Sequence, residues 1–390
     1  MDQSNTVKKA GVPQARELTP AEDFVWDRLV AGSPQGNVFL RSDWLRLLVE
    51  TSHNDLRLMR IGVFNAREEL RGGWAFLYHE RAGVRITEVF DLFYCGPMLA
   101  GDLCGNLSTR GESQRVLAEL IQGASARMDQ LLAETHPNFR DMRPFLYQGW
   151  TVVPEYTHIW DFSNPDALLR VMNREKWREI RRAREQYKIG VEPITEENFR
   201  DFMVLYREAM GKFSWYPPPH WEEMQLRRVR WMEEQDGCRL YTVRDDQGEL
   251  LAGVLALISR EDETAYYWRM GYGAAGRKAI VVPALYWECA QDLCTGENPI
   301  RYINFGSSPQ PALSQFKDYL GAEATEHYRL ILRKPSMRLQ LMDWREQGRD
   351  RARRLVGASA GLRSVYQMLQ RLPFLSMAVG GIGEVLPALF

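Results

Sequence analysis

Apolar residues along the chain repeat with two different periods. Spacings of three and four predict amphipathic helices, which we place at 21–30, 42–52, 111–134, 166–187, 196–210, 280–294 and 311–320, with a further helix ending near Glu234. Alternating or continuous apolar runs bounded by turn residues predict strands, which we place at 57–63, 70–78, 84–92, 156–162, 238–244, 250–258, 264–270, 301–305 and 327–332. The order helix, strands, helix, strands therefore occurs twice.

This repetition predicts an α/β (α+β) protein with two tandem subdomains, each a mixed, mostly antiparallel sheet flanked by helices. We place the first subdomain at 36–165 and the second at 166–335. A leader at 1–35 precedes them, and a basic helical region with an apolar tail at 336–390 follows.

The charge of the chain is balanced overall but not locally. Lys and Arg number 50 against 51 Asp and Glu, which argues against a general polyanion binder and against DNA as a partner. Residues 333–371 hold ten basic and three acidic residues, a net of +7, so the remainder carries −8. The apolar tail at 372–390 contains Glu384, two prolines and three glycines, so it makes a poor membrane span. The basic residues beside an apolar tail in region 333–390 predict a peripheral contact with an anionic membrane surface. The alternative is that the tail packs on the core or on a partner subunit.

The five cysteines form no close pair, and no Cys or His cluster has the spacing of metal ligands. We therefore expect a reducing compartment, the cytoplasm, with the peripheral contact at the inner face of the membrane, and we predict no metal site. Residues 1–20 lack the apolar segment of a signal peptide.

Three segments carry a resemblance to a known family. The first is the arginine-rich stretch that begins at Asn173 and leads into Lys188-Ile189-Gly190-Val191; the others are Ile303-Asn304-Phe305-Gly306-Ser307-Ser308 and the stretch from Ser314 through Phe316-Lys317 to Gly321. Together they resemble the FemAB-like family, the peptidoglycan-bridge aminoacyltransferases and their acetyltransferase relatives. The resemblance covers about residues 36–335 and implies two acetyltransferase-like (GNAT) subdomains.

The resemblance also implies an N-acyltransferase. Such an enzyme moves an acyl group, expected to come from an acyl-CoA, to an amine in cell-envelope or polysaccharide biosynthesis. One alternative is a tRNA-dependent aminoacyltransferase for a cell-wall precursor, although the coiled-coil arm of some members has no counterpart here. The other is a non-catalytic binding protein with the same fold. No tightly bound cofactor is expected; acyl-CoA or aminoacyl-tRNA is the co-substrate, and the acceptor is a small molecule or a cell-wall precursor.

Lys317 is the first candidate for a catalytic side chain. It lies beside the apolar positions Leu313, Phe316 and Leu320 of its predicted helix. A fixed cation stabilises the negative charge that develops on a carbonyl oxygen during acyl transfer, and the family resemblance supports this role. The alternative is a lysine whose stem packs on the core while its ammonium group reaches water. In the oxyanion role, replacing Lys317 with Ala would lower turnover by about 10²-fold.

A glycine-rich loop follows the strand at 264–270. Its sequence, from Gly271 to Gly276, matches the dinucleotide pattern G-x-G-x-x-G. However, antiparallel hairpins precede it, and no second strand that ends in an acidic residue follows it. A Rossmann dinucleotide site is therefore excluded. Backbone N–H groups of Gly273 and Gly276, with Arg277 and Lys278, are candidates for contact with the pyrophosphate of an acyl donor. A plain turn is the alternative.

The remaining candidates are substrate-binding side chains. Four arginines, at 170, 174, 178 and 182, share one face of the helix predicted at 166–187, and this spacing suits phosphate or carboxylate binding as well as an ion-paired surface. Alternation predicts that Tyr267 and Arg269 point to the same side of their strand, where Tyr267 is a second catalytic candidate; aromatic packing is the alternative. No nucleophilic triad and no general base is evident. The substrate-binding candidates are Arg174, Arg178, Arg181, Arg269, Trp215, Tyr216, Gly306 and Ser307.

Overall fold

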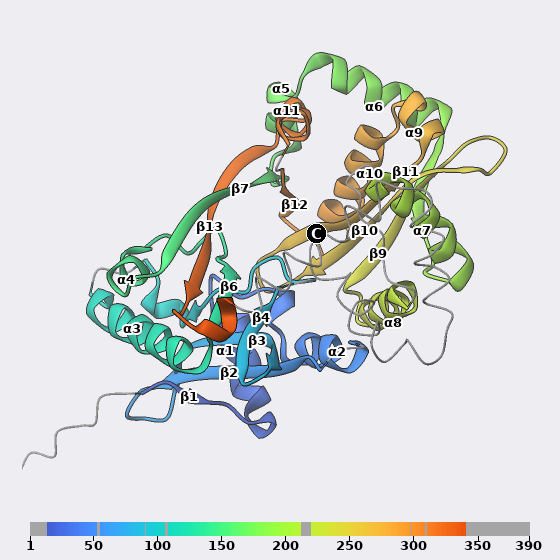
Figure 1. Cartoon of the computed structure of the whole chain (residues 1–390). Helices are drawn as coiled ribbons and strands as arrows, with labels where there is room; N and C mark the ends of the chain where they lie inside the picture. The colour runs from blue at the N-terminus through green and yellow to red at the C-terminus, as the bar shows by residue number, and fades with distance from the viewer. Residues whose placement is uncertain are drawn as a thin grey trace, which may run out of the picture.

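The computed structural model describes residues 14–340, except 53–54, 90, 106–107, 212–219, 297 and 309. Its first half contains β1 (Arg16–Glu17), η1 (Pro20–Glu22), α1 (Asp23–Gly32), η2 (Val38–Leu40), α2 (Ser42–Thr51), β2 (Arg57–Phe64), β3 (Leu70–Arg81), β4 (Val84–Glu88), β5 (Met98–Leu99), η3 (Gly101–Leu103), α3 (Arg110–Arg127), β6 (Gln130–Glu134), α4 (Arg143–Tyr147) and β7 (Thr151–Asp161). We call this part the N half (Figure 1).

The second part, the C half, repeats the same kinds of element. It contains α5 (Pro165–Val171), α6 (Arg174–Gln186), β8 (Lys188–Glu192), α7 (Glu196–Gly211), α8 (Trp221–Glu234), β9 (Cys238–Arg244), β10 (Leu250–Ser259), β11 (Thr264–Tyr272), α9 (Ala274–Ala279), α10 (Val282–Thr295), β12 (Tyr302–Ser307), α11 (Pro311–Tyr319) and β13 (Glu323–Arg333). Among the described residues, no helix combines the length and apolar character needed to span a bilayer.

The two predicted sheets join into one continuous sheet. Its strand order is β1-β2-β3-β4-β6-β13-β7-β12-β11-β10-β9-β8, with β5 attached to β3. The order reads the same from both ends when β1 is matched to β8, β2 to β9, β3 to β10, β4 to β11, β6 to β12 and β7 to β13. Both halves also contain one parallel pair, β4 with β6 and β11 with β12. The halves are therefore two copies of one topology, related by a pseudo-twofold axis between β7 and β13.

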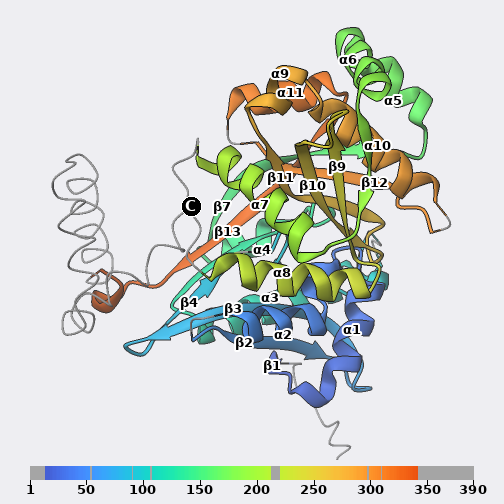
Figure 2. The same ribbon diagram turned by 90° about the vertical axis from the view of Figure 1, so that its right-hand side faces the viewer.

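The last strand of each half lies in the other half. β7 ends the N half but pairs with β12, whereas β13 ends the C half but pairs with β6. The two exchanged strands also pair with each other over nine positions, from Glu323 opposite Ile159 to Ile331 opposite Thr151. Figures 1 and 2 show them side by side between the halves. Neither half can therefore complete its sheet alone.

The apolar core follows the same division. On one face of the sheet, α1, α2, α7 and α8 cover a single cluster that contains residues of both halves. On the other face, α3 and α4 cover a core in the N half, and α5, α6, α10 and α11 cover a separate core in the C half. Residues 20–32, within the predicted leader, form η1 and α1 and bury Trp26 completely, so this part of the chain belongs to the shared cluster.

Three predicted elements differ clearly from the structure. The strand expected at 84–92 ends at Glu88. The helix expected at 111–134 ends at Arg127, and its last residues form β6 instead. Leu131 lies three residues after Met128 and so extends the helical series, but the burial of both Leu131 and Ala133 is the i, i+2 spacing of a strand. The helix expected at 166–187 is interrupted, because the side chain of Asn173 caps a new helix by accepting from the amide of Glu175 at 2.8 Å. Arg170 therefore lies on α5 and not on the helix that carries Arg174.

The strand exchange makes the stability of the two halves interdependent. Leu330 of β13 is fully buried in the core of the N half. We expect Leu330→Ala to lower the free energy of unfolding by about 2–5 kcal/mol and to destabilise both halves in one cooperative transition. Urea unfolding followed by far-UV circular dichroism and by tryptophan fluorescence measures this, with the exposed Val204→Ala as the control. Two separate transitions, with the C half unaffected by the substitution, would contradict the exchange.

Candidate functional site

The parallel strands β11 and β12 part near their middle. They pair only from Thr264 opposite Tyr302 to Tyr266 opposite Asn304. Beyond that point β11 runs on to Tyr272 and β12 to Ser307 with no pairing between them. Where the two strands separate, side chains from other elements can approach their ends. This point lies in the C half, which also carries the predicted site residues.

Asn304 organises the turn at the end of β12. Its side chain is buried and has three partners: it donates from Nδ2 to the hydroxyl of Tyr94 at 2.8 Å, and its Oδ1 accepts from Thr157 Oγ1 at 2.7 Å and from the amide of Gly306 at 2.8 Å. Gly306 has a φ of +72°, and Phe93 lies 3.3 Å from the position a Cβ would take. A left-handed residue beside a packed ring favours glycine over any other residue. The predicted site residue Gly306 is thus fixed by conformation, and the predicted Ser307 follows it as an exposed residue.

Lys317 holds the same turn from the other side. Its Nζ donates to the carbonyl oxygens of Phe305 at 2.9 Å, Gly306 at 2.8 Å and Ser307 at 3.2 Å. A lysine ammonium has three N–H donors, so these contacts account for all of them. The predicted oxyanion role does not fit this geometry, and neither does the alternative of an ammonium group in water, because only 4% of the residue is exposed. Lys317 instead fixes the backbone that ends β12, and burial lowers its pKa to about 8.

A buried histidine adjoins this turn. His158 of β7 stands opposite the irregular stretch between Asn304 and Ser307. The hydroxyl oxygen of Ser308 lies 3.4 Å from its Nδ1, and Ser314 Oγ and Asp318 Oδ1 each lie 3.3 Å from its Nε2. Burial lowers the pKa of His158, and the charge of nearby Lys317 lowers it further. The imidazole of His158 is thus a titratable group beside the end of β12, although its strand, β7, belongs to the N half.

The predicted pairing of Tyr267 with Arg269 on one side of β11 is wrong. Leu255 of β10 stands opposite Arg269 and Ala256 opposite Tyr267, so Trp268 is an extra residue that breaks the alternation. Such a bulge re-aims the side chains that follow it. Tyr267 points into the core of the C half, where its hydroxyl donates to the carbonyl of Tyr286 at 2.7 Å. This contact favours the alternative of aromatic packing for Tyr267. Arg269 points to the opposite face of the sheet.

The glycine-rich loop is explained by packing within the chain. A Cβ on Gly276 would lie 2.1 Å from the carbonyl oxygen of Leu251, and one on Gly271 would lie 2.7 Å from the amide of Tyr206. Gly273 is buried beside Glu208. The N–H group of Gly273 donates to the carbonyl of Leu251 at 3.4 Å, so the cofactor contact predicted for this residue does not fit. The contact predicted for the N–H group of Gly276 stays a prediction.

Arg277 and Lys278 remain exposed at this corner. They lie in the last turn of α9, just before the helix that was predicted at 280–294. Ile280 follows with a φ of +54°, and the longer helix α10 begins at Val282. The two cations thus lie directly before the amino end of α10, which is the end of a helix that favours anions.

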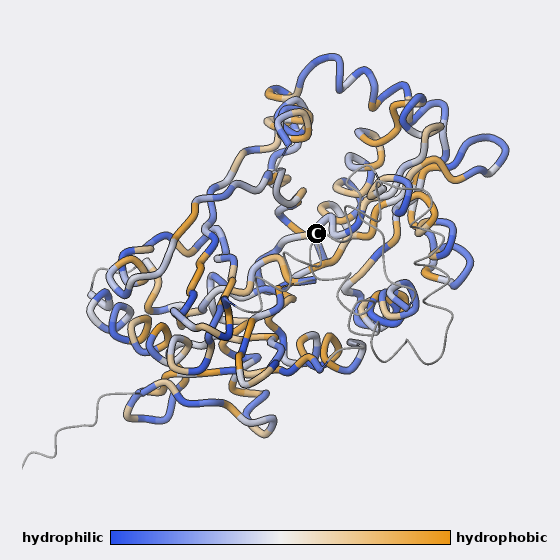
Figure 3. The backbone as a smooth tube through the Cα atoms, in the orientation of Figure 1, coloured by the Kyte–Doolittle hydropathy of each residue, from blue (hydrophilic) through white to orange (hydrophobic). Residues whose placement is uncertain are grey.

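The arginines of α6 form an exposed surface. Arg174, Arg178, Arg181 and Arg182 are exposed, and none has an ion-pair partner among the described residues, whereas Lys176 pairs with Glu179 and Arg184 with Glu288. This outcome favours the predicted anion-binding surface over the ion-paired alternative. Figure 3 shows α6 mostly in the colour of hydrophilic residues, and Figures 1 and 2 place α6 with α5, α9 and α11 at one end of the molecule. The predicted substrate-binding residues Trp215 and Tyr216 lie outside the described residues.

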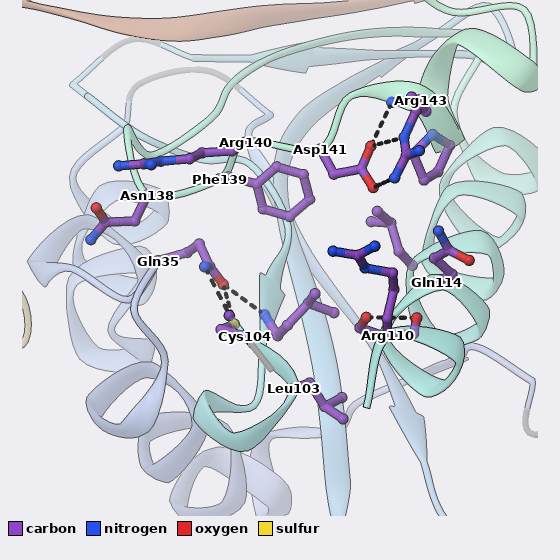
Figure 4. Close-up of a pocket in the computed structure, with 15 residues that line it drawn as sticks. Gln35, Leu103, Cys104, Arg110, Gln114, Asn138, Phe139, Arg140, Asp141 and Arg143 are labelled. Atoms are coloured by element: carbon purple, nitrogen blue, oxygen red, sulfur yellow. Dashed lines mark hydrogen bonds and ion pairs between the residues drawn. The ribbon is translucent and has the colours of Figure 1, made fainter. Parts of the chain in front are cut away.

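A separate cavity of about 620 Å³ lies in the N half. It is lined by residues around η3, the start of α3 and the segment before α4 (Figure 4). Arg143 pairs with Asp141 through two hydrogen bonds of 2.8 and 2.7 Å, and Gln35 contacts Cys104 at 3.5 Å. None of the predicted site residues that the structure describes borders this cavity.

One cluster has the composition of a metal site. Ligand atoms of Glu134, Glu155 and His327 lie within 4.8 Å of one another. However, Arg329 contacts the carboxylates of Glu134 at 3.2 Å and Glu155 at 2.9 Å, so a protein cation already lies between the two acids. The donor set fits an ion-paired cluster across β6, β7 and β13 better than a metal centre.

Three buried polar residues, Asn304, His158 and Asp91, have contacts in the structure that were not predicted from the sequence. Asn304 interrupts the apolar strand Tyr302–Ser307, and a polar residue in such a strand is a signal that could have been used. His158 and Asp91 gave no comparable signal. Their partners lie more than 130 residues away along the chain.

Comparisons with known proteins agree with this architecture. Residues 171–318 match the family model described as an acetyltransferase (GNAT) domain. The crystal structure of FemX matches with a TM-score of 0.61 and 12% identity, over 81% of this chain and 96% of FemX. A tandem GNAT protein from the clavulanic acid biosynthesis pathway matches with a TM-score of 0.49 and 12% identity, over 82% and 97% of the two chains. L-PGS from Bacillus licheniformis matches with a TM-score of 0.45 and 14% identity, over 84% and 96%. The sequence matches no curated protein.

The FemX match shows that the chain has the same fold as FemX, and the family model identifies a GNAT acetyltransferase domain within the C half. The predicted resemblance to FemAB-like GNAT acyltransferases and the predicted mixed α/β class are both confirmed. The matched segment includes the parting of β11 and β12, the glycine-rich loop, the arginines of α6 and Lys317.

Burial of Lys317 predicts a pH-dependent stability. Its pKa is about 8 in the folded protein and 10.5 in its ordinary state. Between these values the unfolded chain binds more protons, so the free energy of unfolding rises with pH through this group. We expect Lys317→Met to be less stable at pH 7 by about 1–3 kcal/mol, because three carbonyl groups lose their donor.

The deficit of Lys317→Met relative to the native chain should grow above pH 8. Urea unfolding of both proteins from about pH 7 to about pH 9.5 measures it. A deficit that stays constant over this range would contradict a buried lysine with a lowered pKa.

Proposed function

We propose that this protein is an N-acyltransferase that moves an acyl group from an acyl-CoA to an amine, with the reaction at the end of β12 in the C half. The parting of β11 and β12 within the segment that matches the GNAT domain carries this proposal. Unpaired neighbouring strands leave backbone groups available to a ligand, and parallel strands present the same end to it. GNAT domains typically use acyl-CoA, which is a co-substrate and not a tightly bound cofactor.

The chemistry requires little covalent participation by the protein. The amine attacks the thioester carbonyl, a C–N bond forms, the C–S bond breaks, and a proton leaves the amine. Positioning and proton removal are the tasks left to the chain. The turn at 305–307 is rigid because Asn304 and Lys317 hold it from two sides. His158, in contact with the hydroxyl of Ser308, offers a titratable group beside that turn.

Cations near the amino end of α10 support a donor with phosphates. Arg277 and Lys278 are exposed directly before this helix. Coenzyme A carries phosphates that such side chains and a helix amino end bind well.

A tRNA-dependent aminoacyl transfer to a cell-wall precursor is the second candidate. The observation that favours it is the exposed arginine surface of α6, whose four arginines lack ion-pair partners among the described residues and exceed what one coenzyme needs. The match to FemX supports a shared fold only, and the function of FemX is not carried over to this chain. The third candidate, a non-catalytic binding protein, has no specific observation in its favour. A peripheral membrane contact through 333–390 stays a prediction, because residues 341–390 lie outside the described part of the chain.

Donor binding distinguishes these candidates. We expect coenzyme A and acetyl-CoA to bind the full chain, and the double variant Arg277→Ala/Lys278→Ala to weaken that binding by about tenfold or more, since each charged contact contributes about 1 kcal/mol or more. Isothermal titration at fixed salt measures it, with Arg143→Ala in the N half as the control.

Binding of charged tRNA alone, with a steep dependence on salt, would favour aminoacyl transfer instead. Failure of coenzyme A, acetyl-CoA and tRNA to bind would remove the enzyme proposal.

A further inference from the structure

The cavity of the N half is lined by both apolar and basic side chains (Figure 4). Its volume of about 620 Å³ is within the range of pockets that hold a small molecule. The apolar part of the lining is formed by residues that the fold buries: Leu99, Leu103, Leu117 and Phe139. Such a lining favours a ligand with an apolar portion, because its contact with these side chains removes apolar surface from water.

Two arginines of this lining have no ion-pair partner. Arg110 and Arg140 are exposed, and neither forms a salt bridge within the part of the chain that the structure describes. The third arginine, Arg143, takes both carboxylate oxygens of Asp141. Its hydrogen bonds lower the pKa of Asp141, and the charge of Arg110 lowers it further. The lining thus holds three arginines and one aspartate, a net charge of +2.

The acidic residues at the start of α3 do not supply the missing partners. Asp102 and Glu112 both contact Arg71, at 2.6 and 3.0 Å. A carboxylate that already accepts from a guanidinium group has less to offer a second cation. The two free arginines of the lining therefore stay available to an anion from outside the chain.

A buried amide adds a hydrogen-bond donor to the same cavity. Gln35 is only 4% exposed, and its Oε1 accepts from the amide of Leu99 at 3.1 Å. Its Nε2 contacts the sulfur of Cys104 at 3.5 Å. A side-chain amide has two N–H donors, and the second has no partner among the residues that the structure describes. A buried donor left unpaired is costly, so a ligand with an acceptor group would gain from this contact.

The repeated topology places this cavity at a meaningful position. It is lined by residues that precede α3, by the first turns of α3 and by the segment that follows β6. The pseudo-twofold axis matches these to the residues before α10, to α10 and to the segment after β12. The parallel strands of the N half also part, because β4 and β6 pair only at Ile86 and Gln130. Parted strands, a helix start and exposed cations therefore occur in both halves.

We propose that the cavity of the N half is a second ligand site, which binds a phosphate ester with an apolar portion. Arg110 and Arg140 hold the phosphate, and Leu103, Leu117 and Phe139 contact the apolar portion. A phosphate monoester carries a charge of about −1.5 to −2 at neutral pH, which matches the +2 of the lining. Guanidinium groups suit its oxygens because of their planar set of donors. This inference does not rest on the proposed acyl transfer in the C half.

Three probes separate the anionic from the apolar contribution. Hexyl phosphate, inorganic phosphate and 1-hexanol are titrated into the full chain at fixed salt, and the dissociation constants are measured by isothermal titration calorimetry. We expect hexyl phosphate to bind at least tenfold more tightly than either of the others, because each of these lacks one of the two portions. Absence of hexyl phosphate binding, or equal affinities for hexyl phosphate and inorganic phosphate, would overturn the proposal.

Variants show which arginines are responsible. Arg110→Gln and Arg140→Gln should each weaken hexyl phosphate binding by about threefold or more, and the double variant by about tenfold or more, since single exposed charges contribute modestly. Arg115→Gln is the matched control, because Arg115 is an exposed arginine of the same helix that does not line the cavity. Melting temperatures show whether each variant is folded. A folded double variant with the affinity of the native chain would contradict the proposal.

Cys104 reports on the cavity directly. It lines the cavity and is partly exposed, as is Cys294 of α10, whereas the other three cysteines are buried. Burial raises the pKa of the Cys104 thiol, so alkylation by iodoacetamide is followed at about pH 9, where more thiolate is present, by peptide mass spectrometry. Saturating hexyl phosphate should slow alkylation of Cys104 at least threefold and leave Cys294 unchanged. Equal slowing at both cysteines, or none at Cys104, would place the ligand elsewhere and overturn the proposal.

Coenzyme A is another source of a phosphate ester, and the same readout separates it from a smaller ligand. It is added to Arg277→Ala/Lys278→Ala, in which the proposed donor site of the C half is weakened. Protection of Cys104 by coenzyme A would identify the coenzyme as the ligand of the cavity, whereas protection by hexyl phosphate alone would identify a smaller phosphate ester. Protection by neither would overturn the proposal and leave the acyl transfer in the C half untouched.

Discussion

The pairing of β7 with β13 is the interaction on which the rest of the structure depends. Each strand ends one half and completes the sheet of the other, so the two copies of the topology share one sheet. The same exchange brings Leu330 of the C half into the core of the N half and His158 of the N half to the end of β12. A domain normally buries its own core, but here the strand that pairs with β6 comes from the C half and the strand that pairs with β12 comes from the N half. The candidate site is therefore a property of the whole chain.

This constraint explains why the C half carries a defined site. β12 is paired on one side with β7 and on the other with only three residues of β11, so its end is held from one side and open on the other. Asn304 and Lys317 fix the open end through the backbone of the turn. The N half keeps the matching parallel pair, but β4 and β6 pair at one position only, Ile86 with Gln130. The cavity of the N half lies beside the start of α3, the helix that corresponds to α10.

Much of the fold could be predicted from the sequence, and less of the site could be. The strands β9 and β10 were predicted at 238–244 and 250–258, nearly the observed bounds, because two apolar runs flank the polar turn residues Asp245-Asp246-Gln247-Gly248. β6 was not predicted, because Leu131 lies three residues after Met128 and so extends the helical spacing of α3. The bulge at Trp268 changed the side to which Arg269 points, and nothing in the alternating pattern of β11 indicates it. Asp91 and the two arginines that donate to it, Arg228 and Arg269, are 137 and 178 residues apart, so their meeting depends on the packing of the two halves and not on any local pattern.

The most direct test of this account is a crystal structure of the full chain with acetyl-CoA bound. The account predicts the thioester carbonyl beside the turn at 305–307, between β11 and β12, with the phosphates near Arg277 and Lys278. It also predicts that Lys317 keeps its contacts with the carbonyl groups of the turn and makes none with the donor. A coenzyme that occupies only the cavity of the N half, or a carbonyl oxygen bonded to Lys317, would contradict it.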